Sequence, residues 1–132
     1  MSRIRLAVVG AHLEGQPLHH QLTNRGAEFV EATTTTRTYR LFALDTEPPK
    51  PGLIRVSRED PAGRAIHVEV WSLGESEFGS FVAEVPAPLG IGRVRLLDGS
   101  EVSGFICESV ALEGALEITE HGGWRAYLAA AR

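Results

Sequence analysis

Residues 66–73 of the chain read IHVEVWSL, and this stretch does most to decide the fold class. Apolar and polar residues alternate along it with a period of two, which predicts a half-buried strand. Directly after it, Phe78, Phe81 and Val85 recur with helical spacing. The sequence therefore predicts a strand at residues 66–73 that is followed directly by a helix over residues 75–85.

A hairpin is predicted beyond this helix. Residues 93–97 and 101–107 flank the dipeptide Asp98-Gly99, which is typical of two-residue turns with positive φ at both positions. The segment PAPLGIG at residues 86–92 predicts a stiff turn that leads into the hairpin.

Local patterns also predict the remaining elements. Residues 4–9 (IRLAVV) predict a buried strand that ends at Gly10, and residues 17–25 predict a short helix that begins at Pro17. Residues 46–52 (TEPPKPG) predict a loop, because three prolines do not fit a central strand. Further strands are expected at residues 27–44 and 53–56, and a C-terminal helix around Trp124, Tyr127, Leu128 and Ala131.

These elements amount to about six strands and three helices, which indicate an α+β fold with a mostly antiparallel curved sheet or barrel. A chain of 132 residues is expected to form one domain that spans residues 1–132.

Composition excludes several classes of function. The chain has 13 basic and 17 acidic residues, no basic run and no apolar stretch near the ~20 residues of a membrane span. We therefore expect no nucleic-acid partner and no membrane partner. Cys107 is the only cysteine, so no internal disulfide forms, and a reducing cytoplasm is the expected compartment. The histidines lack metal-ligand spacing, and no metal is expected.

The turn after the first strand is the main candidate site. His12 lies there in the sequence VGAHLEG, and Gly10 allows backbone amides to approach a ligand closely. The amides of residues 10–13, which include Ala11 and Leu13, predict a small nest for an anion. The alternative is an ordinary strand-to-helix turn with an exposed histidine.

Four residues are further candidates for anion binding. Arg37 and Tyr39 share one face of a predicted strand, and a guanidinium suits two-point contact with a carboxylate. Lys50 and Gly52 belong to the proline-rich loop, whose lysine is within reach of an anion. Glu84, near the end of the second helix, is a candidate general acid or base. Solvated surface groups are the alternative at each position.

Six segments taken in order resemble the C-terminal domain of allophanate hydrolase, and they are collinear over nearly the whole chain. They are VVGAHLEGQPLHHQL, TYRLFAL, PPKPGLIRV, IHVEVWSL, PAPLGIGRVRLLDGSEVSGFICE and ITEHGGWRAYL.

The resemblance implies a γ-glutamyl cyclotransferase-like fold, a small mixed β-barrel with packed helices. In such folds the loop after the first strand holds a carboxylate-bearing ligand, and residues 10–13 match that loop. Cyclotransferases carry a tyrosine where this chain has Val9. Glu84 is nearest to the position of their catalytic glutamate.

The resemblance also implies a reaction. In allophanate hydrolase an amidase converts allophanate into N-carboxycarbamate and ammonia, and the C-terminal domain is thought to decarboxylate that product. Applied here, His12 is the expected proton donor, Tyr39 orients a carboxylate, and no cofactor is required. A separate amidase subunit is an expected partner, and a homodimer stays open.

Two other hypotheses remain. One is a non-catalytic module that binds the same ligand or docks onto an amidase. The other is cyclotransferase chemistry through Glu84, which the missing tyrosine disfavours.

Overall fold

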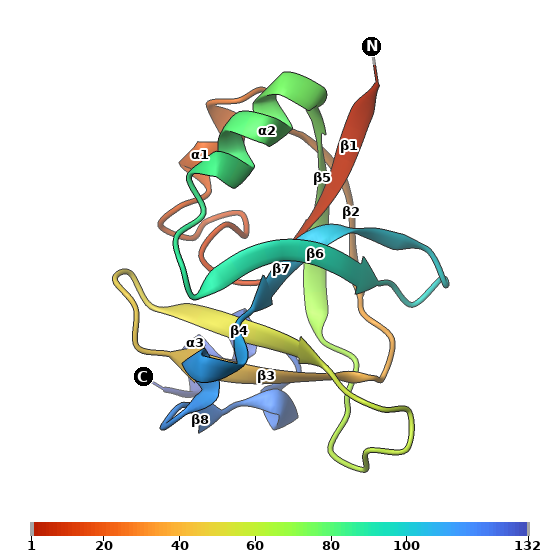
Figure 1. The fold of residues 1–132 in the computed structure, drawn as a ribbon, viewed down its shortest axis with the longest axis vertical. Helices are drawn as coiled ribbons and strands as arrows, with labels where there is room; N and C mark the ends of the chain where they lie inside the picture. Colours follow the sequence, from red (N-terminus) through yellow and green to blue (C-terminus); the bar gives the residue numbers. More distant parts are fainter. Residues whose placement is uncertain (1, 132) are drawn as a thin grey trace.

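A five-stranded sheet forms the centre of the computed structural model, which describes residues 2–131 (Figure 1). Its strands lie in the order β2-β5-β1-β7-β6, and only the contact between β1 and β7 is parallel. The strands are β1 (Arg3–Val8), β2 (Glu28–Thr34), β5 (His67–Gly74), β6 (Leu89–Arg95) and β7 (Glu101–Cys107).

The two edges of this sheet meet and close it into a small barrel at one end. Thr35 bridges to Leu96. The amide of Thr36 donates to the carbonyl of Arg95 at 3.0 Å, and the amide of Leu97 donates to the carbonyl of Thr34 at 3.0 Å. The predicted α+β fold with a small mixed barrel is therefore confirmed.

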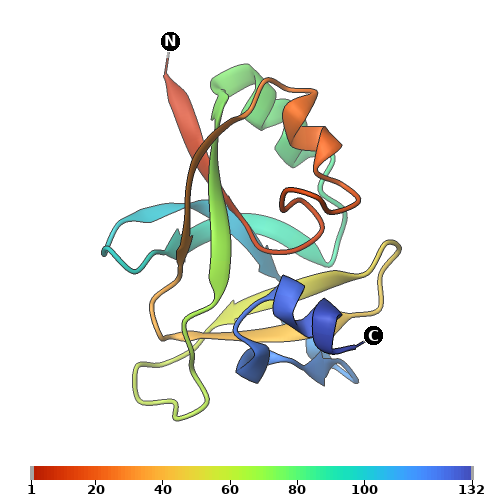
Figure 2. The same cartoon turned by 180° about the vertical axis from the view of Figure 1, so that it is seen from behind.

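A three-stranded sheet packs beside the barrel, in the lower part of Figure 1. It has the order β4-β3-β8. The C-terminal helix covers this region in both views (Figure 2). The elements are β3 (Tyr39–Leu44), β4 (Lys50–Arg55), the 3-10 turn η1 (Ser109–Leu112), β8 (Leu116–Glu117), the 3-10 turn η2 (Thr119–His121) and α3 (Trp124–Ala130).

Two short helices lie together at the other end of the barrel. The predicted helix over residues 75–85 is confirmed as α2 (Glu75–Ala83), with Phe81 buried. The helix predicted over residues 17–25 is much shorter, because only α1 (His20–Thr23) is helical and consecutive turns flank it. None of the helices within residues 2–131 has the length and apolar composition of a membrane-spanning segment.

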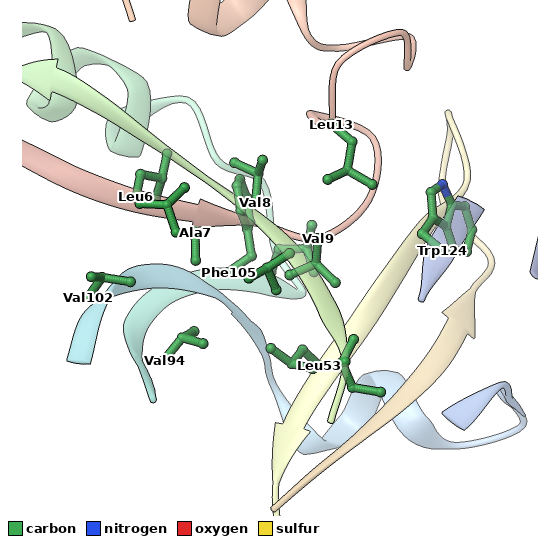
Figure 3. Packing of buried hydrophobic residues seen from close by; sticks show 14 of the residues in the cluster. Leu6, Ala7, Val8, Val9, Leu13, Leu53, Val94, Val102, Phe105 and Trp124 are labelled. Carbon is green, nitrogen blue, oxygen red and sulfur yellow. The ribbon is translucent and has the colours of Figure 1, made fainter. Parts of the chain in front are cut away.

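Apolar side chains fill the space inside the barrel and continue to the second sheet (Figure 3). β1 is central to this core, because Leu6, Ala7 and Val8 have no exposed surface. Burying a leucine or valine side chain stabilises the fold by about 1.5–3 kcal/mol. The core fixes the end of β1, and therefore the starting point of the loop that follows.

Two predicted loops are partly strands. Residues 50–52 belong to β4, where Pro51 lies opposite Ala43. β4 is an edge strand, and a proline is tolerated there because one side of the strand has no neighbour that needs its N–H group. The prediction of a loop assumed that the prolines would lie in a central strand. The predicted turn over residues 86–92 was also too long, because β6 begins at Leu89.

The β6–β7 hairpin is confirmed, but its turn differs from the prediction. Leu96 and Ser100 close a three-residue loop, in which the amide of Gly99 donates to the carbonyl of Leu96 at 2.9 Å. Gly99 has φ of 91°, whereas Asp98 does not have a positive φ. A three-residue loop needs the left-handed conformation only at its last position.

Candidate functional site

A cavity of about 200 Å³ opens between the loop after β1, the segment before β4 and the end of α2. Figures 1 and 2 show these three segments converging on one side of the barrel. We call it the His12 cavity. Its lining includes His12, Gln21, Glu47, Lys50, Glu84 and Phe105. This volume is smaller than the ~300 Å³ and more of drug-sized pockets, so it suits a small ligand.

His12 is held in a defined orientation, with only 6% of its surface exposed. Its ring stacks on Phe105 at 4.9 Å between centroids and meets the edge of Phe81 at 5.1 Å. Its Nε2 donates to Oε1 of Gln21 at 2.8 Å. The carbonyl of His12 accepts a hydrogen bond from Nδ1 of His19 at 2.8 Å. Both the ring and the backbone of this residue are therefore fixed.

The imidazole of His12 is neutral near pH 7. Burial lowers its pKa from 6.5 to about 4, the hydrogen bond with Gln21 acts in the opposite direction, and the charge of Lys50 lowers it further. The expected proton donor is therefore uncharged in the empty cavity, and it becomes an acid only when something raises its pKa.

Lys50 is the only lysine of the chain, and it is 6% exposed. It lines the cavity beside His12. Within residues 2–131 no carboxylate lies within 4.0 Å of its ammonium group. The ammonium group therefore has no acidic partner in the part of the chain that the structure describes, and an anion bound in the cavity would provide one.

The backbone of the loop adjoins this lysine. Gly10 and Ala11 line a second, much smaller cavity of about 10 Å³, which shares His12 and Lys50 with the His12 cavity. The amide of Leu13 donates to the carbonyl of Gly10 at 3.0 Å, so it is not free for a ligand. Among the described residues, the backbone amides of Gly10, Ala11 and His12 donate no turn or loop hydrogen bond.

Glu84 lies at the rim of the His12 cavity, at the C-terminal end of α2. Its side chain is 63% exposed, and its carboxylate pairs with Arg25 at 3.0 Å. Glu84 is therefore a solvent-exposed, ion-paired carboxylate at the rim of the cavity.

The structure does not bring three of the candidates to this cavity. Tyr39 is fully buried, and its hydroxyl accepts a hydrogen bond from the amide of Arg95 at 2.9 Å. Arg37 lines a separate surface depression next to Gly63. Gly52 packs against Cys107 within β4, away from the lining residues.

Sequence reasoning missed the residues that hold His12. Gln21 comes from α1, and Phe105 from β7. Neither has a local pattern that distinguishes it from a surface amide or a core phenylalanine, since only the return of the chain brings them to His12.

Comparison with known proteins shows the family and the fold to which these residues belong. The model of the allophanate hydrolase C-terminal domain family matches residues 4–129. The chain is 48% identical over 128 residues to urea amidolyase of Saccharomyces cerevisiae. The aligned region covers 94% of this chain and 7% of that protein. The chain thus spans less than a tenth of the length of this curated relative.

Solved structures show the same relation. An allophanate hydrolase of Kluyveromyces lactis matches the whole chain with 43% identity and a TM-score of 0.93, over 22% of its own length. A uropathogenic E. coli-specific protein is 37% identical, with a TM-score of 0.88 and 98% coverage of both chains.

A γ-glutamyl cyclotransferase at 11% identity and a TM-score of 0.57 shares the fold alone. The chain belongs to the allophanate hydrolase C-terminal domain family.

Proposed function

We propose that this chain binds a small dicarboxylate in the His12 cavity and decarboxylates N-carboxycarbamate. The observation that carries the proposal is Lys50, which is 6% exposed, has no acidic partner among the described residues and lines the same cavity as a neutral imidazole. An anion is the ligand that such a cavity favours, because it supplies the opposite charge that the ammonium group of Lys50 lacks.

The two ends of a dicarboxylate have different partners in this proposal. Lys50 binds one carboxylate as a point charge. The other carboxylate lies on the side of the loop, toward the amides of Gly10, Ala11 and His12, which donate no turn or loop hydrogen bond within residues 2–131. The small volume of the cavity selects ligands of a few heavy atoms.

His12 supplies the proton that the reaction needs. When the C–N bond of N-carboxycarbamate breaks, CO₂ leaves and the electron pair stays on nitrogen, which must be protonated to give carbamate. A bound dianion raises the pKa of His12, so the imidazole takes up a proton as the ligand binds. Because Nε2 already donates to Gln21, the proton is added at Nδ1. Transfer of a proton to the leaving nitrogen then lowers the barrier.

The position of the matching segment in larger relatives supports this role. The chain corresponds to 22% of the Kluyveromyces lactis allophanate hydrolase and 7% of the yeast urea amidolyase. A domain that consumes the product of an amidase gains from lying in the same protein, or from docking to a separate amidase. We propose that an amidase supplies the substrate of this chain.

Calorimetric titration with malonate tests the ligand class, since malonate is a stable dicarboxylate of the same shape. We expect wild-type protein to bind malonate and Lys50→Met to lose binding. Arg55→Met is the matched control, because Arg55 is a half-exposed cation on the same strand and lies 3.8 Å from Glu101. Its malonate affinity should equal that of the wild type.

Two outcomes would overturn the proposal. Absence of malonate binding would leave the non-catalytic docking role as the better account. Binding of 5-oxoproline instead of malonate would favour cyclotransferase chemistry.

A further inference from the structure

A carboxylate on β5 connects the loop after β1 to the C-terminal helix α3. We call residues 10–14 of this loop the His12 loop. Glu69 is 6% exposed, and its Oε1 accepts hydrogen bonds from the amide of Glu14 at 2.9 Å and from Nε1 of Trp71 at 3.1 Å. Its Oε2 pairs with Nη2 of Arg125 on α3 at 2.8 Å. The same Nη2 also donates to the carbonyl of Glu14 at 2.7 Å. Both backbone groups of Glu14 are therefore bound by one ion pair.

The network keeps Glu69 ionised. Burial alone would raise the pKa of this carboxyl group, but the hydrogen bonds from Glu14, Arg125 and Trp71 lower it more, and the net shift is downward. Charge-assisted hydrogen bonds of this kind are shorter and stronger than neutral ones. The Glu69–Arg125 ion pair, which we call the clamp because it binds both backbone groups of Glu14, is therefore charged at both residues.

Glu14 lies two residues after His12, on the far side of the turn that Gly10 and Leu13 close. On its other side the loop is fastened by the amide of Leu18, which donates to the carbonyl of Ala11 at 2.8 Å. The segment that carries the free amides and His12 is therefore short and fixed at both ends. Release of Glu14 would remove the contacts that join the C-terminal end of this segment to β5 and α3.

We propose that Glu69 and Arg125 are positioning residues, which hold the His12 loop in the geometry that binds the anion. This inference rests on the proposed function, because it assigns the clamp to that same cavity. Neither residue lines the His12 cavity, so both act through the loop backbone.

A second ion pair of the chain provides the matched control. Arg40 on β3 binds Glu117 on β8 through two hydrogen bonds of 2.8 and 2.6 Å. This pair joins two strands of the second sheet, and neither of its residues lines the His12 cavity. Breaking it tests what the loss of an Arg–Glu pair does to stability alone.

The test compares Glu69→Gln, Arg125→Lys and Glu117→Gln in malonate titration and in urea unfolding. We expect the first two variants to weaken malonate binding by about tenfold, because small displacements of binding groups cost that much or more. Glu117→Gln should lower the free energy of unfolding and leave malonate affinity within about twofold of wild type. Arg125→Lys retains the charge but not the fork, so it keeps the test valid if Glu69→Gln fails to fold.

Equal malonate affinity in the wild type and both clamp variants would overturn the inference. The same holds if Glu117→Gln weakens binding as much as Glu69→Gln, because the effect would then be general destabilisation.

The NMR signals of the His12 ring separate this inference from the proposed function. If wild-type protein binds no malonate, the proposed function is refuted. The positioning role of Glu69 and Arg125 is then tested by the His12 ring signals of the ligand-free protein. Glu69→Gln should shift them and Glu117→Gln should not. Unchanged signals in Glu69→Gln would refute the positioning role.

Discussion

Acidification should destabilise this protein through His12 in a range where carboxylates contribute little. The pKa of His12 is about 4 in the folded chain, against 6.5 for the free side chain. Between these two pH values the unfolded chain binds a proton that the folded chain does not. Stability therefore falls as the pH falls, with a slope of about 1.4 kcal/mol per pH unit.

The size of the effect follows from the width of that range. Between pH 7 and pH 4, His12 should lower the free energy of unfolding by about 3 kcal/mol. The contribution is fully present above pH 6.5 and is lost as the pH approaches 4. For a domain with a total stability of about 5–15 kcal/mol, this loss is easily measured.

Urea unfolding at four pH values from 7 to 4 measures it, with tryptophan fluorescence as the signal. His12→Gln should show a shallower pH dependence than wild type by about 3 kcal/mol over this range. His67, whose pKa burial also lowers, is present in both proteins and cancels in the comparison. Equal slopes for wild type and His12→Gln would refute the reasoning.

Four further predictions concern the loop after β1, helix α2 and the His12 cavity. Gly10→Ala should destabilise the protein by about 1–3 kcal/mol in urea unfolding, since the added Cβ would lie 2.1 Å from Cδ of Pro51. Gly79→Ala, inside α2 with nothing within 4 Å, should instead stabilise it by about 0.5–1 kcal/mol, and the opposite order would contradict the packing. Lys50→Met should leave the free energy of unfolding unchanged or raise it, and a large loss would show that Lys50 has a structural partner. Malonate binding should take up protons, measured as a difference in titration enthalpy between two buffers, and no uptake would contradict the proposed role of His12.

The fold was predictable where local pattern and tertiary position agree. The alternation at residues 66–73 and the dipeptide Asp98-Gly99 are local signals, and β5 and the β6–β7 hairpin form there. Pro51 shows where such reasoning fails, because it is tolerated in β4 only as an edge strand. The order of the strands in the sheet was not predictable, because it depends on contacts between segments that are far apart in the sequence.

The candidate site was predictable in part for the same reason. His12 was chosen because loops at strand ends carry ligands, and Lys50 because the lysine of a stiff proline-rich loop is within reach of an anion. Both residues line one cavity. Tyr39 was chosen for its chemistry, but its face of β3 points into the core and its hydroxyl binds the amide of Arg95. Gln21 was missed because its contact with His12 depends on how the loop returns to α1.

The most direct test of the account follows the fate of labelled carbon. Carboxyl-¹³C-labelled allophanate is mixed with an amidase that lacks a domain of this family, and ¹³CO₂ and bicarbonate are followed by NMR with and without this chain. The account predicts that wild-type chain accelerates CO₂ release, that Lys50→Met and His12→Gln lose the acceleration, and that Arg55→Met keeps it. Release at the same rate without the chain, or with Lys50→Met in place of wild type, would contradict it.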